Sequence, residues 1–212
     1  MRDNVRWFYA LLYKPLYPWA RLVLAALAIP LALSFLQPLW RIRMEAPQYP
    51  GGLRMDIYAY KLEGGNEGRD IAEINELNHY IGMAKIERSQ FPDLDWIPFA
   101  FGALVLLSLR AAAVGTLRDL LDLCVLICYV SAFSLARFLL KLYAFGHDLD
   151  PHAAVRIQPF MPAFLGTKQV GNFTTHAYPL PGTYMVAVFA AGTVLITVWH
   201  FVREWRRRHE HQ

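Results

Sequence analysis

Four stretches of the chain are almost continuously apolar, and polar residues gather between them. The stretches cover residues 20–40, 96–115, 120–142 and 182–202. Each approaches the roughly 20 apolar residues that a helix needs to cross a bilayer. Because lipid offers no partners for backbone N–H and C=O groups, each stretch is predicted to be helical. The pattern predicts an all-α integral membrane protein with four transmembrane helices.

The polar segments between these helices have patterns of their own. Residues 53–62, LRMDIYAYKL, alternate between apolar and polar and predict a strand. Residues 68–87 predict an amphipathic helix, with Asp70 as N-cap and Glu73 three positions later. The proline-rich segment 143–181 is expected to be irregular. Since each segment alone is too short to bury a core, the two are expected to pack together as a small α+β region.

The basic residues predict the orientation. The expected order is an interfacial N-terminus (1–19), the first span (20–40), loop 1 (41–95), the second span (96–115), a turn (116–119), the third span (120–142), loop 2 (143–181), the fourth span (182–202) and a basic tail (203–212). Eight Lys and Arg residues lie in the short segments on the side of the termini, and Arg21 and Arg110 stand near the same ends of their spans, which makes ten against nine in the two long loops. The positive-inside rule then places both termini in the cytoplasm and both loops outside an inner (plasma) membrane.

Composition supports the membrane class and narrows the partners. Of the 212 residues 56% are hydrophobic and 18% are charged, below the roughly 25% charged of a soluble domain. The net charge of +4 comes largely from the tails and suits anionic lipid headgroups. Membrane lipid is therefore an expected partner, and nucleic acid is not. The sequence contains no G-x-S-x-G, P-loop or H-E-x-x-H signature, so we expect a protein that is not an enzyme.

One histidine and one methionine raise the possibility of a metal site. His79 and Met83 stand four residues apart, on the polar side of the helix predicted around residues 71–84. A solvated helix face explains such a pair as well. Apart from Met1, the methionines lie in the two loops or at the start of the fourth span, and this placement beside loop histidines favours a metal site. Thioether and imidazole groups together suit copper, and thioethers suit Cu(I) especially. The candidate copper ligands in and around the loops are His79, Met83, Met161, His176, Met55 and Met44.

Two further pairs leave their alternatives open. Cys124 and Cys128, one turn apart in the third span, can relay a soft cation or serve as small apolar residues. His147 and His152, which flank two aspartates, can bind a divalent ion or remain solvated.

Four strings in the loops carry a family resemblance. APQYPGGLRMDIY, DIAEINELNHYIGM, FPDLDWIPF and GTKQVGNFTTHAYPLPG resemble a group of small polytopic membrane proteins. The genes of that group accompany nitrous-oxide-reductase and other copper-enzyme maturation genes, and NHYIGM is the most specific part of the likeness. The resemblance implies extracytoplasmic metal handling, and it supplies no mechanism and no catalytic residues.

Two classes of function fit these observations. The first is an accessory protein that handles copper outside the membrane for a membrane or periplasmic metalloprotein. The second is a structural or assembly subunit of a membrane respiratory or metallo-oxidoreductase complex. A transporter fits less well, because the spans contain few charged or broken-helix features at mid-membrane depth. Copper handling requires metal bound to the protein purified alone, whereas a subunit should co-purify with partners.

Overall fold

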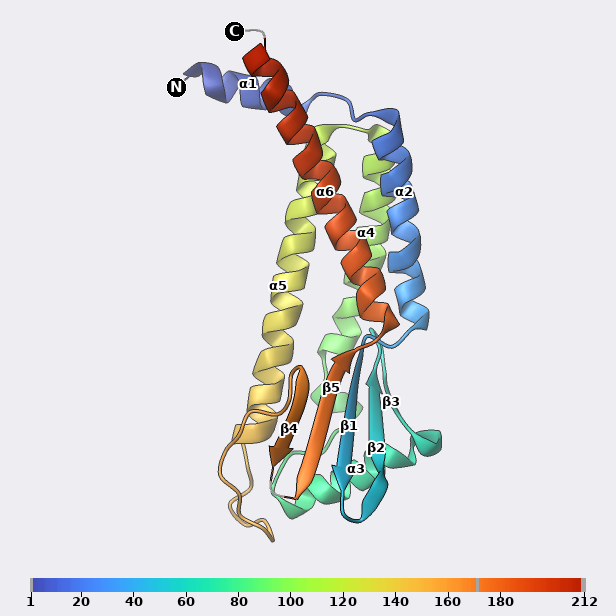
Figure 1. Cartoon of the computed structure of the whole chain (residues 1–212), viewed down its shortest axis with the longest axis vertical. Coiled ribbons are helices and arrows are strands. Elements are labelled where there is room, and N and C mark those ends of the chain that lie inside the picture. Colours follow the sequence, from blue (N-terminus) through green and yellow to red (C-terminus); the bar gives the residue numbers. More distant parts are fainter. Residues whose placement is uncertain (1, 171, 211–212) are drawn as a thin grey trace. The chain divides into compact units, whose positions relative to one another are not determined.

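Two compact units make up the chain, and each combines segments that are far apart in sequence. The computed structural model describes residues 2–170 and 172–210. The helical unit comprises Met1–Leu33, Phe99–Ser131 and Met185–Gln212, and the sheet unit comprises Ser34–Pro98 and Ala132–Tyr184. Figure 1 labels the elements of both units.

Four helices of the described chain are long and apolar enough to cross a membrane, which indicates a multi-pass membrane protein. They are α2 (Pro18–Leu33), α4 (Asp93–Val114), α5 (Leu117–His147) and α6 (Pro181–Glu210), and the short α1 (Arg2–Leu12) precedes them. The prediction of four helical spans is confirmed at this level. The first predicted span was too long, because α2 gives way to the 3-10 turn Ser34–Leu36, and Trp40 already belongs to a strand.

Backbone carbonyls satisfy polar side chains that are buried inside the helical unit. The Ser108 hydroxyl donates to the carbonyl of Leu24 at 3.1 Å. The Thr193 and Thr197 hydroxyls each donate to the carbonyl one turn earlier in α6. An unpaired buried hydroxyl costs free energy, so these bonds explain how polar residues are accommodated between apolar helices.

The sheet unit contains a five-stranded antiparallel sheet with the order β3-β2-β1-β5-β4. Its strands are β1 (Trp40–Ala46), β2 (Tyr49–Ile57), β3 (Leu62–Gly64), β4 (Gly166–Val170) and β5 (Phe173–Pro179). β1 pairs with β5, so segments 41–95 and 143–181 form one sheet, in agreement with the expected joint α+β region. The expectation that segment 143–181 is irregular was wrong for β4 and β5, where alternating Phe173, Thr175 and Ala177 supply one face of a hairpin.

The strand predicted over residues 53–62 is displaced in the structure. β2 already ends at Ile57, and a tight turn follows in which the Tyr58 N–H donates to the Lys61 carbonyl at 2.9 Å. β3 then begins at Leu62. The apolar alternation therefore belongs to two strands joined by a turn.

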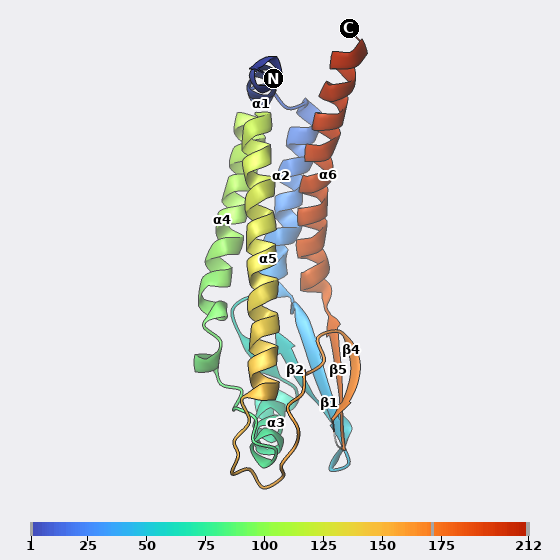
Figure 2. The same ribbon diagram turned by 90° about the vertical axis from the view of Figure 1, so that its left-hand side faces the viewer.

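One face of the sheet, the inner face, carries Ile42, Met44, Leu53 and Met55 and is covered by α3 (Arg69–Tyr80). Figures 1 and 2 show this helix lying along one side of the sheet. The buried core of this contact comprises Leu53, Met55 and Ile74, with partly buried Ile42, Met44, Tyr49, Ile57, Leu62, Ile71, Leu77 and Ile86 packed around it. Alternation along the strands and a helical period in α3 thus bury the apolar side of each element.

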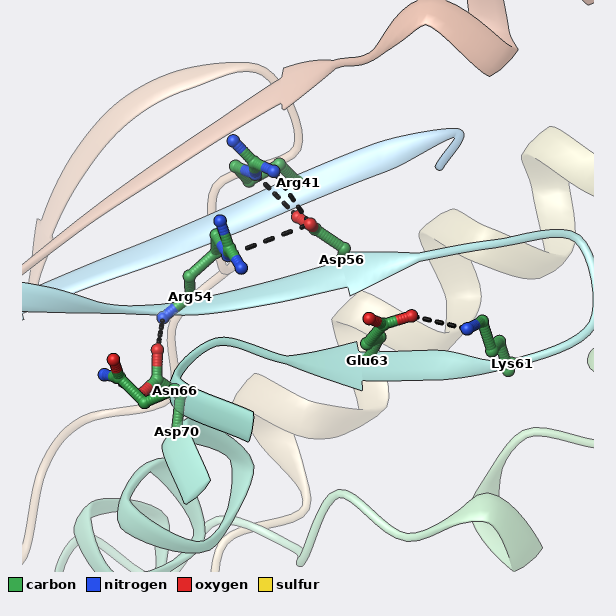
Figure 3. Close-up of polar contacts among 7 residues, drawn as sticks. All are labelled: Arg41, Arg54, Asp56, Lys61, Glu63, Asn66 and Asp70. Carbon is green, nitrogen blue, oxygen red and sulfur yellow. Dashed lines mark hydrogen bonds and ion pairs between the residues drawn. The ribbon is translucent and has the colours of Figure 1, made fainter. Parts of the chain in front are cut away.

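The opposite, outer face of the sheet carries Arg41, Arg54 and Asp56 in an ion-pair cluster (Figure 3). Arg41 donates through Nε and Nη2 to the two carboxylate oxygens of Asp56, at 2.6 and 2.7 Å. These bonds raise the pKa of Arg41 above its usual value. Asp56 is 7% exposed, so its charge depends on this bidentate partner.

Asp70 joins α3 to the sheet and does not cap the helix. Its Oδ2 accepts the backbone N–H of Arg54 at 2.8 Å, and its Oδ1 accepts the side-chain amide of Asn66 at 2.7 Å (Figure 3). The predicted N-cap was wrong, because Gly68, with φ at +90°, occupies that position and no side chain caps the helix. An aspartate near the start of a helix can accept a hydrogen bond from an N–H of the helix or from the backbone of another segment. Here the donor is the Arg54 N–H of β2.

Candidate ligand-binding cavity

Three of the predicted copper ligands lie around one cavity in the sheet unit. Met44 comes from β1, Met55 from β2 and Met83 from the segment that follows α3, and all three line a cavity of about 100 Å³. Met44 and Met55 are diagonal neighbours, because Met44 pairs with Leu53 and Met55 pairs with Ile42. Diagonal residues on one face of a sheet are within reach of long side chains. The strand register therefore brings these thioethers to one wall.

His79 lies outside this group, because the helix ends earlier than predicted. α3 stops at Tyr80, and Gly82 follows with φ at +78°. The Met83 N–H donates to the Asn78 carbonyl at 2.8 Å, and the Gly82 N–H donates to the His79 carbonyl at 3.2 Å. This pair of bonds is a Schellman motif, which needs a left-handed residue that glycine adopts without strain. The predicted helical stacking of His79 and Met83 was wrong: His79 is exposed, whereas Met83 lines the cavity.

His176 is separated from the methionines by the sheet itself. It pairs with Arg43, whereas its neighbour Thr175 pairs with Met44, so the His176 side chain belongs to the outer face. There its Nδ1 lies 2.8 Å from the Thr167 hydroxyl. Met161 lies half-buried in the segment between α5 and β4 and is not among the residues that line the cavity. The six candidates therefore do not form one site.

No three His, Cys, Asp or Glu side chains within residues 2–170 and 172–210 gather so that they could hold a metal ion. His147 and His152 belong to no such group among the described residues. The His147 Nδ1 lies 3.0 Å from the Tyr143 carbonyl, and His152 is exposed beside Asp150. The thioethers that share one cavity in the described chain are those of Met44, Met55 and Met83, while the soft thiols of Cys124 and Cys128 stand one turn apart on α5.

The cavity wall is almost entirely apolar. β5, α5 and the connecting segments contribute five aromatic rings, those of Phe91, Phe138, Phe145, Phe160 and Phe173. The aliphatic remainder of the wall comprises Ile42, Ile57, Ile74, Ile81, Ile86, Leu142, Pro162, Ala163 and Val170. For comparison, an engineered apolar cavity of about 150 Å³ stays dry and binds benzene. The enclosed space therefore suits a small apolar group or part of a longer chain.

A few polar groups stand on this wall, and Asn78 is the deepest of them. It is 1% exposed. Its Nδ2 lies 3.5 Å from the Ala84 carbonyl, and its Oδ1 is buried without a hydrogen-bond partner in the described chain. A buried acceptor of this kind is costly unless a donor reaches it. The other polar lining residues are Thr175, Lys141 and Lys168.

Lys141 reaches the cavity from α5 across aromatic rings. Its Nζ lies 5.4 Å from the Phe91 ring centroid and 5.2 Å from that of Phe145, and 3.4 Å from the amide oxygen of Gln90. None of the described residues that line the cavity is an aspartate or glutamate. The wall thus combines an apolar interior with cationic groups and no compensating carboxylate.

Sequence reasoning missed Asn78, Lys141 and Lys168 as site residues. A signal for Asn78 exists, because it stands four residues after Ile74 and seven after Ile71, in the middle of the apolar side of α3. An amide at such a position must find a buried partner. The lysines carry no such signal, since their place on the wall depends on how α5 and β4 pack in the sheet unit.

Comparison of the chain with protein-family models, with curated proteins and with solved structures finds no match. Its architecture therefore defines its class. The chain combines four helices of membrane-spanning length and composition with a five-stranded antiparallel sheet and one short covering helix.

Proposed function

We propose that this protein binds an apolar, lipid-like ligand in the cavity between the sheet, α3 and α5. The observation that carries the proposal is the wall itself, with five phenylalanines, three methionines and one buried amide oxygen that lacks a donor. Ligand sites of this kind are mostly apolar, with a few polar groups that orient the ligand. Methionine side chains are flexible and polarizable, so they adapt to ligands of irregular shape.

The membrane supplies ligands of this chemistry. α5 contributes Phe138, Leu142 and Phe145 to the wall, and the same helix is apolar enough to span a bilayer.

A pair of neighbouring substitutions on β5 tests this proposal. Thr175 faces the cavity opposite Met44, whereas Thr174 pairs with Glu45 on the outer face. Thr175→Phe fills the cavity, and Thr174→Phe adds the same ring to the other face. Mass spectrometry of the purified protein, released gently from its detergent, should show a bound apolar molecule in the parent and in Thr174→Phe but not in Thr175→Phe. Equal retention by both variants, or no bound molecule in the parent, would refute the proposal.

A second candidate function is Cu(I) binding by Met44, Met55 and Met83, because these thioethers line the same cavity. Thioethers are soft ligands that favour Cu(I). This candidate retains the copper-handling accessory role implied by the sequence, with a smaller set of ligands. It is the weaker candidate, because Lys141 and Lys168 on the same wall repel a cation and no carboxylate compensates them.

Cu(I) competition with a chromogenic chelator separates the two candidates. If the thioethers hold copper, Met83→Leu should weaken binding by about tenfold or more, since one of three ligands is lost. His79→Gln should then change nothing, because His79 lies outside the cavity. Cu(I) binding that depends on His79 and not on Met83 would contradict this ligand set.

A further inference from the structure

The charged groups on the cavity wall define the ligand more narrowly. We propose that the ligand is a single-chain amphiphile with an anionic head, a carboxylate or a phosphate monoester, which Lys141 and Lys168 bind while the chain enters the cavity. This inference rests on the proposed apolar-ligand function and adds the chemistry of the head.

The positive charge of Lys141 is attracted by the Asp93 carboxylate but forms no direct ion pair within the described chain. It forms no ion pair with a carboxylate among residues 2–170 and 172–210, and its polar neighbour is the neutral Gln90 amide. The nearby Asp93 carboxylate is already held by Arg137, whose Nε and Nη2 lie 2.9 and 3.2 Å from its two oxygens. The ammonium group lies over the Phe91 and Phe145 rings, which hold it against the apolar wall.

Lys168 supplies a second cation to the wall, from β4 rather than from α5. It lies on β4 and pairs in register with Thr175 of β5, on the face that lines the cavity. A lysine at the centre of an apolar surface usually extends its charge toward water. The Lys168 side chain is exposed while its stem contributes to the wall, so its charge stands at an open edge. An anion that reaches the cavity meets a wall that carries both lysines and Thr175, whereas its chain meets apolar side chains and the Asn78 amide.

The enclosed volume agrees with a chain rather than a bulky lipid. About 100 Å³ is less than the roughly 150 Å³ that accommodates benzene, so the closed part admits one narrow chain segment. A double-chain phospholipid would leave most of its apolar surface outside. The charge pattern and the narrow space therefore select the same class of molecule.

Photo-labelling with matched probes tests the head group separately from the chain. The parent protein in nanodiscs of phosphatidylcholine is exposed to three single-chain probes with a diazirine near the chain end: a fatty acid, the corresponding fatty alcohol and a lysophosphatidate. Label on Met83, Phe145 and Ala163 is compared with label on Leu106 and Leu195, which are 68% and 67% exposed on the candidate spans and report general contact with lipid. The two acids should label the cavity about tenfold more than the alcohol, as expected for a charge-assisted contact.

The variants decide which part of the argument holds. Lys141→Gln combined with Lys168→Gln should reduce labelling by the acids to that of the alcohol, and Lys141→Arg with Lys168→Arg should restore it. Lys61→Gln, on a lysine already paired with Glu63, should have no effect. Equal labelling by acid and alcohol, or labelling that survives removal of both lysines, overturns the anionic head and leaves the apolar-ligand function standing. No cavity label from any probe overturns both. The ratio between fatty acid and lysophosphatidate shows whether the head is a carboxylate or a phosphate.

Discussion

Gly82 ends α3 and receives the loop that follows α5, and its replacement by alanine should loosen this contact. The Gly82 carbonyl accepts the Asp150 N–H at 2.8 Å, and the Tyr80 carbonyl accepts the Val155 N–H at 2.9 Å. A Cβ on Gly82 would lie 2.9 Å from the Asp150 N and O atoms and from the Ala153 Cβ. These atoms are backbone or short side chain, so the loop itself must move.

The loss of stability in Gly82→Ala has two parts, one from backbone conformation and one from steric overlap. A left-handed φ of +78° costs alanine roughly 1–2 kcal/mol, of which about 0.4–1 kcal/mol is regained through the less flexible unfolded chain. The steric overlap adds about 1–3 kcal/mol, as overpacking usually does. We therefore expect Gly82→Ala to lower the free energy of unfolding by about 3 kcal/mol. Gly68→Ala should lose about 1 kcal/mol, because Gly68 has φ at +90° and no atom within 4 Å of an added Cβ.

Hydrogen exchange at the Asp150 and Val155 amides is the direct assay. A local loss of about 2 kcal/mol from the steric part should speed their exchange roughly 30-fold in Gly82→Ala. Gly68→Ala, at the other end of the same helix, should leave these two amides unchanged. Exchange in Gly82→Ala within threefold of the parent would show that the loop does not dock on this glycine.

Three further predictions concern charge and topology. Asp56→Asn should destabilise the sheet unit by about 2 kcal/mol in thermal unfolding, between the cost of breaking an exposed and a buried pair, because the Arg41 guanidinium loses its bidentate partner; a cost below 0.5 kcal/mol would contradict this. The backbone N–H of His152 lowers the pKa of Asp150, so the ionised carboxylate stabilises the loop fully above its ordinary pKa of 3.8, and this stability is lost as pH falls through the lowered pKa. Hydrogen exchange of the loop amides, measured at decreasing pH, should show this loss in the parent and not in Asp150→Asn. Reporters fused after residues 65 and 115 should report opposite sides of the membrane, the former extracytoplasmic, and the same side for both would refute the topology.

The long-range composition of the chain predicts the spans well, because a bilayer imposes one simple requirement over about 20 residues. The sheet was less predictable for a specific reason. β1 begins at Trp40, directly after an apolar run, so its first residues read as the end of a span. β5 contains the adjacent Thr174 and Thr175 and ends at Pro179, two residues before Pro181, a composition that favours turns as much as strands. Both strands form because they pair with each other, and pairing between residues 129 to 139 positions apart leaves no local signal.

The candidate site shows the same division between local and distant information. That Met44 and Met55 share a face follows from the alternation of each strand, once the strands are known. That Thr175 joins them and His176 does not depends on the register of β1 against β5, since a shift by one residue would exchange their faces. Lys141 lies inside the predicted third span, but it stands on the wall because the part of α5 from Ala132 onward belongs to the sheet unit.

The string NHYIGM acquires a different meaning from its place in the fold. Asn78 faces the cavity, His79 and Tyr80 face away, Ile81 is buried, Gly82 turns the chain and Met83 returns to the cavity. As a helix, the string would place His79 and Met83 on one side as a pair of ligands. As a helix end, it places Asn78 and Met83 on the same wall and joins them by a backbone hydrogen bond from the Met83 N–H to the Asn78 carbonyl. The glycine therefore determines which side chains can act together, and the buried amide of Asn78, rather than the imidazole of His79, is the polar group that this turn presents to a ligand.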